Sequence, residues 1–523
     1  MVGRAWAIVT VLGTLAIPAT GQEKSILIRN GHLLDGSGNP WIYADVLIRG
    51  DRIDAVGDLD SVSADEVIDA SGLYVAPGFI DTHSHAGEGL ASPELSHAEP
   101  LLAMGLTTIF ANPDGGGPVD IAEQRQQLLA QGLGVNVAQF ISHGAIRGEV
   151  LGLANRDATQ AELDRMRELT REGMEEGGWG LSSGTFYAPG NFAPPKEIEE
   201  LAKVIASYRG AYQSHIRDES TYSVGLIAAV DEVINVGRVA GIPVIVTHVK
   251  ALGPLVWGFG SAIVHRIERA RSEGVQVFAD QYPYTASATG LGAALVPRWA
   301  QAGGKDSLAA RMSSPETRAE ILAAMVEGLR RRGGADRIQF RRYLPDTSIE
   351  GRTLSEVARE RGQDPIGAAV DLVLSGGPGI VSYNMHDSDV ETLMVQPWTM
   401  TSSDGDLVPM SEGVPHPRSY GTFARKIRLY VVDKGVVALE DAVRSMTSLP
   451  AMVYGMKDRG VLRAGAAADV VVFDFDAVRD VATYADPHHY SEGMVHVFVN
   501  GVAAIRDGAF TGSRSGRVLQ KNH

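Results

Sequence analysis

Short stretches in which apolar and polar residues alternate occupy both ends of the chain. Near the N-terminus they read SILIRNGHLLDGSG, ADVLIRGDRIDAVG and EVIDASGLYVAPGF, and near the C-terminus GVLRAGAAADVVVFDFD and GMVHVFVNGVAAIRDG. Alternation with a period of two, punctuated by Gly and Asp, predicts short strands joined by turns. Chain termini often lie close together in folded domains. We therefore predict that residues 22–77 and 456–523 pair into one small β-sandwich domain.

The long middle part of the chain, residues 78–455, alternates short apolar strands with amphipathic helices. The strands include TTIFANPDG, VNVAQFISHGA, GAYQSHIRDES, IPVIVTHVKALG, VQVFADQYPYTAS and TMTSSDGD, and a typical helix is ATQAELDRMRELTREGMEEG. This alternation predicts a parallel sheet. Seven or eight such units, with no GxGxxG motif after the first strand, favour a closed (β/α)8 TIM-like barrel over an open doubly wound sheet. The stretch of about 290–375 is longer than one unit needs, which predicts a helical insertion.

The first residues of the chain predict a signal peptide, residues 1–21. They read MVGRAWAIVTVLGTLAIPATGQE, in which Arg4 precedes an apolar run from Ala5 to Ile17. The run is shorter than the ~20 apolar residues that a membrane-spanning helix needs. We expect export, most simply to a Gram-negative periplasm, with no membrane span after signal removal. An N-terminal anchor helix is the alternative.

Composition narrows the range of partners. The chain has 523 residues, of which 44% are hydrophobic and 21% charged, as is typical of globular proteins. Its formal net charge of −16, with no run of Lys and Arg, argues against a nucleic-acid partner. The chain contains no cysteine, so a disulfide framework is excluded. We expect a small-molecule substrate, and no pattern specifies an oligomeric state.

Four histidines stand at the ends of apolar strands in the predicted barrel. His83 and His85 end GFIDTHSH, His215 ends AYQSH, and His248 ends VIVTH. Active sites of such barrels lie at the C-terminal ends of the strands, and residues two apart on a strand face the same side. Imidazole nitrogens suit zinc or a similar metal ion. The pattern predicts a metal centre, and the alternative is a set of buried histidines with structural hydrogen bonds.

Asp404, in TMTSSDGD, follows a late strand of the same barrel. A carboxylate in that place can face a metal-activated water as general base and then as general acid. Asp followed by Gly is also a common turn pair, so an Asx turn without a catalytic role is the alternative. We predict that Asp404 is the catalytic residue.

An ordered set of motifs adds a family resemblance. The motifs are GFIDTHSH, SHIRDES, THVKALG, QYPYTAS, SSDGD, HPRSYGTFARK, MTSLPA and DRGVLRAGAAADVVVFD. Together they resemble N-acyl-D-amino-acid deacylases of the amidohydrolase superfamily, over residues 26–519. In that family a barrel carries the metal site and the joined termini form a β-sandwich. The resemblance implies zinc-dependent hydrolysis of the amide bond of N-acyl-D-amino acids to a carboxylate and a free D-amino acid.

The resemblance also implies the roles of the metal-site residues. It implies that His215 and His248 hold the principal zinc ion and that His83 and His85 can hold a second. One or two zinc ions are therefore expected. Asp404 is implied to transfer protons.

Three further residues are implied to bind the substrate. Arg418, in HPRSYG, would bind the α-carboxylate with its guanidinium fork. Lys250 and Tyr282 would help to orient the amide. A structural ion pair is the alternative role for Arg418.

The sequence departs from the family pattern at two places. Where these deacylases usually carry a zinc-binding cysteine, this chain reads ANPDGGG and has Asp114. Asp is a competent zinc ligand and can bridge two ions, so we predict that Asp114 binds metal; a Pro113–Asp114–Gly115 turn without metal contact is the alternative. In QYPYTASAT the family's substrate-binding serine matches Ala288, so Ser287, one place earlier, is the candidate for this contact.

Two other functional classes stay open at this point. One is hydrolysis of a cyclic amide, or of a dipeptide or another exported amide. The other is a non-catalytic periplasmic binding protein on a degenerate barrel, motivated by the altered residue at position 114.

Overall fold

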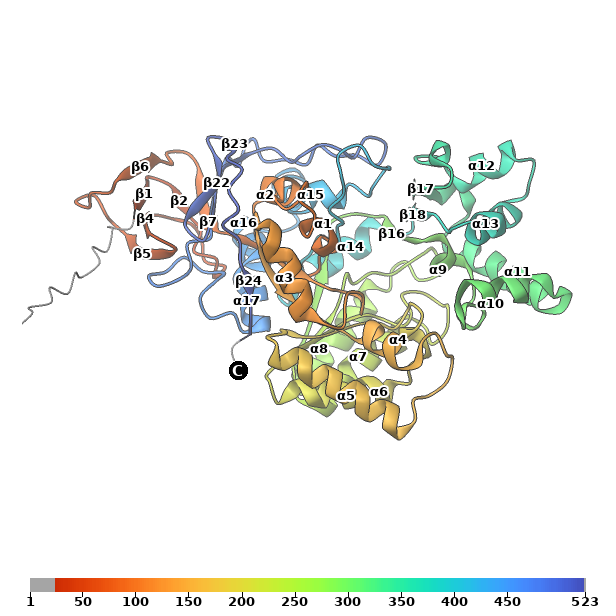
Figure 1. Cartoon of the computed structure of the whole chain (residues 1–523). Coiled ribbons are helices and arrows are strands. Elements are labelled where there is room, and N and C mark those ends of the chain that lie inside the picture. The colour runs from red at the N-terminus through yellow and green to blue at the C-terminus, as the bar shows by residue number, and fades with distance from the viewer. Residues whose placement is uncertain (1–23, 522–523) are drawn as a thin grey trace, which may run out of the picture.

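The computed structural model describes residues 24–521, and the predicted signal peptide, residues 1–21, lies outside this range. Figure 1 shows a β-sandwich at one end of the molecule, a barrel with its helices in the middle, and a mainly helical part at the opposite end. None of the helices within residues 24–521 combines the length and apolarity required to span a membrane.

The sandwich consists of two sheets built from both ends of the chain. The first sheet has the order β5 (Arg52–Gly57), β4 (Asp45–Arg49), β1 (Ser25–Arg29), β6 (Glu66–Asp69). The second has the order β23 (Ala509–Phe510), β22 (Val502–Arg506), β21 (Met494–Val499), β20 (Val470–Phe473), β7 (Tyr74–Pro77), β2 (His32–Leu33), β3 (Ile42–Tyr43). Val471 of β20 lies opposite Ala76 of β7 in an antiparallel pair. The predicted pairing of the two chain ends is confirmed.

The continuous apolar run of β20 is explained by burial on both faces. Val470 and Val472 point into the core between the two sheets. Val471 and Phe473 point the other way, into a second core that includes residues of the barrel. Because side chains alternate across a strand, one short strand connects the two cores.

The barrel forms a closed ring of eight parallel strand positions within residues 24–521. In order they are β8 (Phe79–Asp81), β9 (Leu106–Ala111), β10 with β11 (Asn136–Gln139, Ile141–Ser142), β12 (Gly180–Gly184), β13 (Ala211–His215), β14 (Val244–Val246), β15 (Val277–Gln281) and β19 (Thr399–Thr401). The amide of Asp404 donates to the carbonyl of His83 at 2.9 Å, and that of His85 to Gly405 at 2.9 Å. These bonds close the ring between β19 and β8, so the predicted (β/α)8 barrel is confirmed.

Amphipathic helices cover the outside of the barrel (Figure 1). They include α3 (Ile121–Gln131), α5 (Gln160–Glu175), α6 (Pro195–Ala206), α7 (Leu226–Ala240), α8 (Gly260–Ser272), α14 (Asp387–Met394) and α16 (Leu439–Met446). Other helices are α1 (Gly87–Leu90), α2 (Glu99–Ala103), α4 (His143–Leu151), α15 (Arg418–Arg425) and α17 (Ser448–Tyr454). In α5 a capping box of Thr159 and Glu162 starts the helix, and Met166, Leu169 and Met174 form its buried face.

An insertion with its own apolar core lies between β15 and β19. Its helices are α9 (Leu291–Leu295), α10 (Gly304–Ser313), α11 (Pro315–Arg331), α12 (Leu354–Glu360) and α13 (Pro365–Leu374). An antiparallel sheet accompanies them, with the order β16 (Ser287–Gly290), β18 (Gly379–Ser382), β17 (Ile338–Arg342). The predicted helical insertion, about 290–375, is therefore mostly helical but also contains a sheet. Its strands of four or five residues are too short for periodicity to distinguish them from loops.

The end of the chain leaves the sandwich and joins the barrel. Val518 of β24 (Val518–Leu519) pairs in parallel with Val137 of β10. The barrel strand is interrupted at Phe140 between β10 and β11, and the tail covers the edge that β10 leaves open. Within the predicted second sandwich segment, 456–523, the strand Val518–Leu519 therefore belongs to the barrel sheet and not to the sandwich.

Candidate metal centre and substrate cavity

Five barrel strands bring the predicted metal and catalytic residues to one rim. These residues are His83 and His85 after β8, Asp114 after β9, His215 at the end of β13, His248 after β14, and Asp404 after β19. Parallel strands end at the same side of the barrel, which is why residues far apart in sequence meet there. The structure brings all six together.

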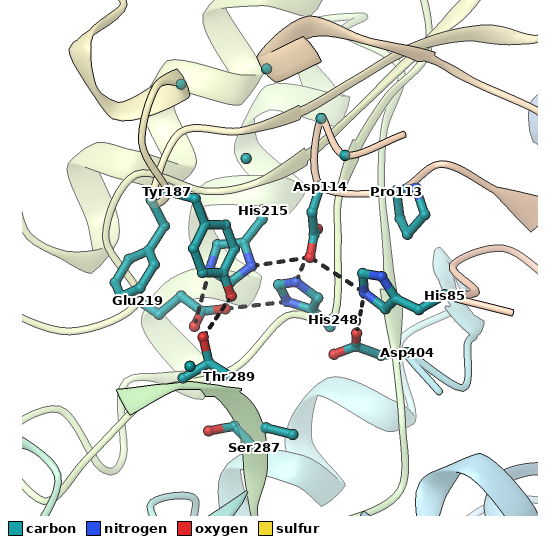
Figure 2. Close-up of a pocket in the computed structure, with 18 of the residues that line it drawn as sticks. His85, Pro113, Asp114, Tyr187, His215, Glu219, His248, Ser287, Thr289 and Asp404 are labelled. Atoms are coloured by element: carbon teal, nitrogen blue, oxygen red, sulfur yellow. Dashed lines mark hydrogen bonds and ion pairs between the residues drawn. The ribbon is translucent and has the colours of Figure 1, made fainter. Parts of the chain in front are cut away.

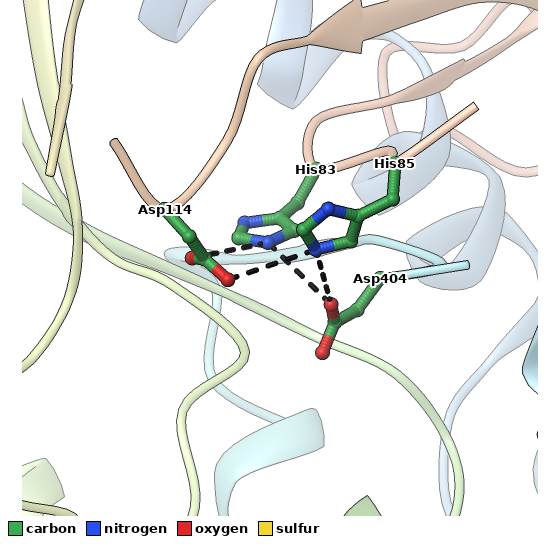
Figure 3. A group of neighbouring side chains, drawn as sticks. All are labelled: His83, His85, Asp114 and Asp404. Atoms are coloured by element: carbon green, nitrogen blue, oxygen red, sulfur yellow. Dashed lines mark hydrogen bonds and ion pairs between the residues drawn. The ribbon is translucent and has the colours of Figure 1, made fainter. Parts of the chain in front are cut away.

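The first group of donors joins both sides of the barrel closure (Figure 3). Asp114 Oδ1 lies 3.3 Å from His83 Nε2, and Asp114 Oδ2 lies 3.6 Å from His85 Nε2. Asp404 Oδ1 lies 3.1 Å from His85 Nε2 and 3.5 Å from His83 Nε2. One donor atom from each of the four residues lies within 4.8 Å of the others, close enough to hold one ion.

A second group shares Asp114 with the first (Figure 2). Asp114 Oδ1 lies 3.5 Å from His248 Nε2, and Asp114 Oδ2 lies 3.6 Å from His215 Nδ1. The carboxylate of Asp114 therefore stands between the two histidine pairs, in the arrangement that a bridging ligand requires.

A tight turn holds Asp114 in this position. The amide of Gly116 donates to the carbonyl of Pro113 at 2.9 Å, and Asp114 has a left-handed φ of 56°. A Cβ atom at Gly184 would collide with the carbonyl oxygen of Asp114, so glycine permits the close approach of the two loops. The turn expected as the alternative is present, and it also carries the carboxylate into the histidine cluster.

His248 and Asp404 also adopt left-handed backbone conformations. Their φ angles are 36° and 50°, which are unfavourable for residues with a side chain. The backbone N–H of His248 donates to Asp280 Oδ1 at 2.7 Å, and the backbone N–H of Asp404 donates to the backbone carbonyl of His83 at 2.9 Å. Strained residues of this kind persist where the surroundings fix them and are frequent at functional sites.

A cavity of about 630 Å³ opens over the two groups. Its walls include every residue predicted to bind substrate, namely Lys250, Tyr282, Ser287 and Arg418. Lys250 Nζ donates to Glu219 Oε1 at 2.5 Å. The Tyr282 ring has Lys250 Nζ 5.6 Å and Arg418 Cζ 4.8 Å from its centre. The four side chains and the metal-binding groups therefore face one cavity.

Arg418 forms an ion pair with Asp404. The distance from Arg418 Nη1 to Asp404 Oδ2 is 2.7 Å, yet Nη1 makes no hydrogen bond. Burial opposes ionisation of Asp404, but the charges of Arg418 and His248 outweigh it and hold its pKa well below the usual range. The structure thus contains the ion pair expected as the alternative role of Arg418, and the same side chain also lines the cavity.

The sequence prediction omitted several charged residues of the cavity, among them Glu219, Arg341 and Asp406. Glu219 lies 3.2 Å from His248 Nδ1, and Arg341 forms an ion pair with Asp406. Glu219 stands in the quoted motif SHIRDES, four residues after His215, which was the available signal. Asp406 likewise stands in the quoted motif SSDGD, two residues after Asp404, whereas Arg341 belongs to β17 of the insertion, where no motif marks it.

Comparison with known proteins agrees with this geometry. Residues 66–505 match the sequence profile of the amidohydrolase family. The chain is 34% identical to a D-aminoacylase of Alcaligenes xylosoxydans xylosoxydans, over 96% of this chain and 98% of the relative. The chain belongs to the D-aminoacylase family of amidohydrolases. It is equally 34% identical, over 96% of this chain and 98% of the relative, to an N-acyl-D-glutamate deacylase of the same organism.

A solved structure shows that the similarity of this amidohydrolase extends to its fold. The structure is that of an N-acyl-D-glutamate deacylase from Bordetella bronchiseptica in complex with zinc and a phosphonate inhibitor. The TM-score is 0.81 at 32% identity, and the match covers 96% of this chain and 100% of the other.

The donor set of this amidohydrolase fits a metal ion. Both ring nitrogens of His83 and of His215 are buried without a hydrogen bond, and so is Asp114 Oδ1. Buried polar atoms without partners are costly, and metal coordination would satisfy them. Burial opposes a positive charge on His85, but Asp114 and Asp404 outweigh it and raise its pKa to about 10. The cluster therefore attracts positive charge.

Proposed function

We propose that the protein is a zinc-dependent hydrolase that cleaves the amide bond of N-acyl-D-amino acids. The products are a carboxylate and a free D-amino acid. The observation that carries the proposal is the cluster of four histidines around Asp114, which faces the cavity that also contains Asp404 and Arg418. The D configuration is supported by the similarity, along nearly the whole chain, to a D-aminoacylase and an N-acyl-D-glutamate deacylase.

Two sets of residues would hold one or two zinc ions. His215 and His248 with Asp114 form one set, and His83 and His85 with Asp114 form the other. Nitrogen and carboxylate ligands are those that zinc binds in proteins. When bound, zinc polarises the acyl carbonyl and lowers the pKa of water.

The chain's own residues perform the remaining steps. Asp404 accepts a proton from the attacking water at a carboxylate oxygen and donates it to the nitrogen of the departing amine. Arg418, which lines the cavity, binds the α-carboxylate of the substrate with its guanidinium group. Lys250 and Tyr282 orient the amide; Lys250 Nζ lies 5.6 Å from the centre of the Tyr282 ring. Ser287 adds a hydroxyl on the cavity wall.

The decisive experiment is a screen of N-acetyl-D- and N-acetyl-L-amino acids, scored by amine release, with and without added zinc. We expect zinc-dependent turnover of the D series. Turnover of only the L series would overturn the substrate assignment. Mass analysis of the products distinguishes a cyclic amidohydrolase, because ring opening releases no second molecule.

The position of Asp114 supports an enzyme over a degenerate binding protein. That alternative was motivated by the absence of the family cysteine, but Asp114, at the matching position of the sequence, has its carboxylate 3.3 to 3.6 Å from all four histidines. Metal analysis of the purified protein is the direct test, with at least one tightly held zinc ion expected per chain.

We further propose that the enzyme is exported. The support is the predicted signal peptide, residues 1–21, with its short apolar run. Fractionation of a Gram-negative host followed by N-terminal sequencing tests this. A cytoplasmic protein that retains Met1 would contradict it.

A further inference from the structure

Arg332 is a buried cation on the wall of the substrate cavity. It follows α11 in the insertion, and its side chain lines the cavity together with Ser287 and Leu252. Only 1% of its surface is exposed. A guanidinium remains charged in proteins, so this burial places a full positive charge beside the substrate.

No acidic side chain within residues 24–521 forms an ion pair with Arg332, and its Nε makes no hydrogen bond. Two neutral groups lie beside it. In one of the two orientations of the Asn384 amide, the amide oxygen lies 3.2 Å from Arg332 Nη1. The ring of Tyr222 lies 5.9 Å from Arg332 Cζ. The amide oxygen accepts a hydrogen bond and the ring attracts the cation through its π electrons, but neither group carries a negative charge.

The other cations that line the cavity are different, because each has an acidic partner. The pairs are Lys250 with Glu219, Arg341 with Asp406, and Arg418 with Asp404. Buried charges in proteins are normally paired, because an uncompensated one is costly. Among the Lys and Arg side chains that line the cavity, Arg332 is thus the one without an acidic partner in the described part of the chain, residues 24–521.

A second arginine strengthens the positive field at this end of the cavity. Arg298 lies with its Cζ 3.7 Å from the ring centre of Phe186, a cavity residue, and 5.2 Å from that of Tyr222. Burial, together with the charge of Arg332, lowers the pKa of Arg298 to about 10. Asp218 is the acid whose negative charge raises the pKa of Arg298. Its carboxylate already accepts hydrogen bonds from three backbone N–H groups. The insertion therefore supplies surplus positive charge to one side of the cavity.

We propose that Arg332 binds a second carboxylate of the substrate, in addition to the α-carboxylate. This inference rests on the proposed function and narrows the range of substrates to N-acyl-D-amino acids with a second carboxylate. The second carboxylate belongs either to the amino-acid side chain, as in D-glutamate or D-aspartate, or to a dicarboxylic acyl group. Ser287, which lines the cavity and whose hydroxyl lies 3.0 Å from the Asn384 amide nitrogen, supplies a neutral hydroxyl to the same carboxylate.

Matched pairs of substrates test the proposal on the unmodified enzyme. The first pair is N-acetyl-D-glutamate and N-acetyl-D-glutamine, and the second is N-succinyl-D-leucine and its terminal amide. We expect kcat/KM to be at least about 10-fold higher for the acid of one pair, because a hydrogen bond to a charged group contributes a factor of about 10 to 100. The pair that shows the preference identifies which part of the substrate carries the carboxylate.

Variants then assign the preference to Arg332. In Arg332→Gln the preferred acid should lose about 10- to 100-fold in kcat/KM, while its amide changes much less. The control is Arg330→Gln, which removes the same charge two residues earlier on α11, where the side chain forms an exposed ion pair with Glu327 at 2.9 Å. Its acid-to-amide ratio should equal that of the wild type.

The outcomes separate this inference from the proposed function. If N-acyl-D-amino acids are hydrolysed but acids and amides react equally well in both pairs, the Arg332 proposal is wrong and the proposed function stands. If no N-acyl-D-amino acid is hydrolysed, both fail. An acid preference that survives in folded Arg332→Gln would also overturn the assignment.

Discussion

Replacement of Asp114 is the most direct test of the metal centre. Its two carboxylate oxygens lie 3.3 to 3.6 Å from one nitrogen of each of His83, His85, His215 and His248. Asp114→Asn keeps the size of the side chain and removes the negative charge that both donor groups share. Even changes to groups that only orient metal ligands weaken metal binding by about 10- to 100-fold. We therefore expect Asp114→Asn to weaken zinc binding by at least about 100-fold.

The effect can be measured without relying on catalysis. At a free zinc concentration of about 100 times the wild-type Kd, binding stabilises the folded protein by about 2.7 kcal/mol, and a 100-fold weaker site retains only about 0.4 kcal/mol. Denaturant unfolding with and without zinc gives this difference, and equilibrium dialysis with elemental analysis gives the metal content. Asp114→Cys should keep most of the binding, because thiolate is also a good zinc ligand.

A matched control is Asp406→Asn, which changes an acid of the same cavity that pairs with Arg341. This variant should keep the zinc-dependent stabilisation. Equal metal content and equal stabilisation in Asp114→Asn and the wild type would refute the bridging role of Asp114.

Three further predictions concern catalysis and stability. Asp404→Asn should lower kcat by at least about 100-fold in a steady-state amine-release assay, and full activity in that variant would place the proton transfer elsewhere. Burial lowers the pKa of Lys426 from 10.5 to about 7, so the folded protein loses this proton at a lower pH than the unfolded chain does. The free energy of unfolding should therefore rise by about 1.4 kcal/mol per pH unit between these values, and subtracting the pH–stability curve of Lys426→Met from that of the wild type should isolate this slope. Asp469→Ala should cost about 3 to 5 kcal/mol in urea unfolding, because it leaves the buried Arg459 without its partner, whereas Glu492→Ala, in an exposed pair, should cost less than about 1 kcal/mol.

The metal site could be predicted from the sequence because its signal is local. His83 and His85 are two residues apart after an apolar strand, and His215 and His248 stand at the ends of two others. A parallel barrel converts equivalent positions in successive strands into neighbouring positions in space. Knowing which residues end the apolar strands was therefore sufficient to predict which side chains meet, although not the distances between them.

Other features could not be predicted because they depend on tertiary contacts. The tail strand β24 is two residues long, and only the interruption of the barrel strand at Phe140 explains where it binds. Arg332 enters the cavity from the end of a helix that lies outside the barrel pattern. An arginine in an Arg-rich helical segment is normally solvated, so its burial without an acidic partner becomes visible only when the fold is known.

In the proposed mechanism, chemistry and selectivity come from different parts of this chain. The barrel strand ends supply the candidate metal ligands and Asp404, whereas the insertion between β15 and β19 supplies Arg332 and the surplus positive charge around it. The insertion has its own apolar core, so its surface can change without disturbing the strands that position the histidines. Substitutions at Arg332 should accordingly alter the choice between acidic and neutral substrates while zinc content stays constant. Loss of zinc in a folded Arg332→Gln protein would show instead that the insertion and the metal centre are coupled.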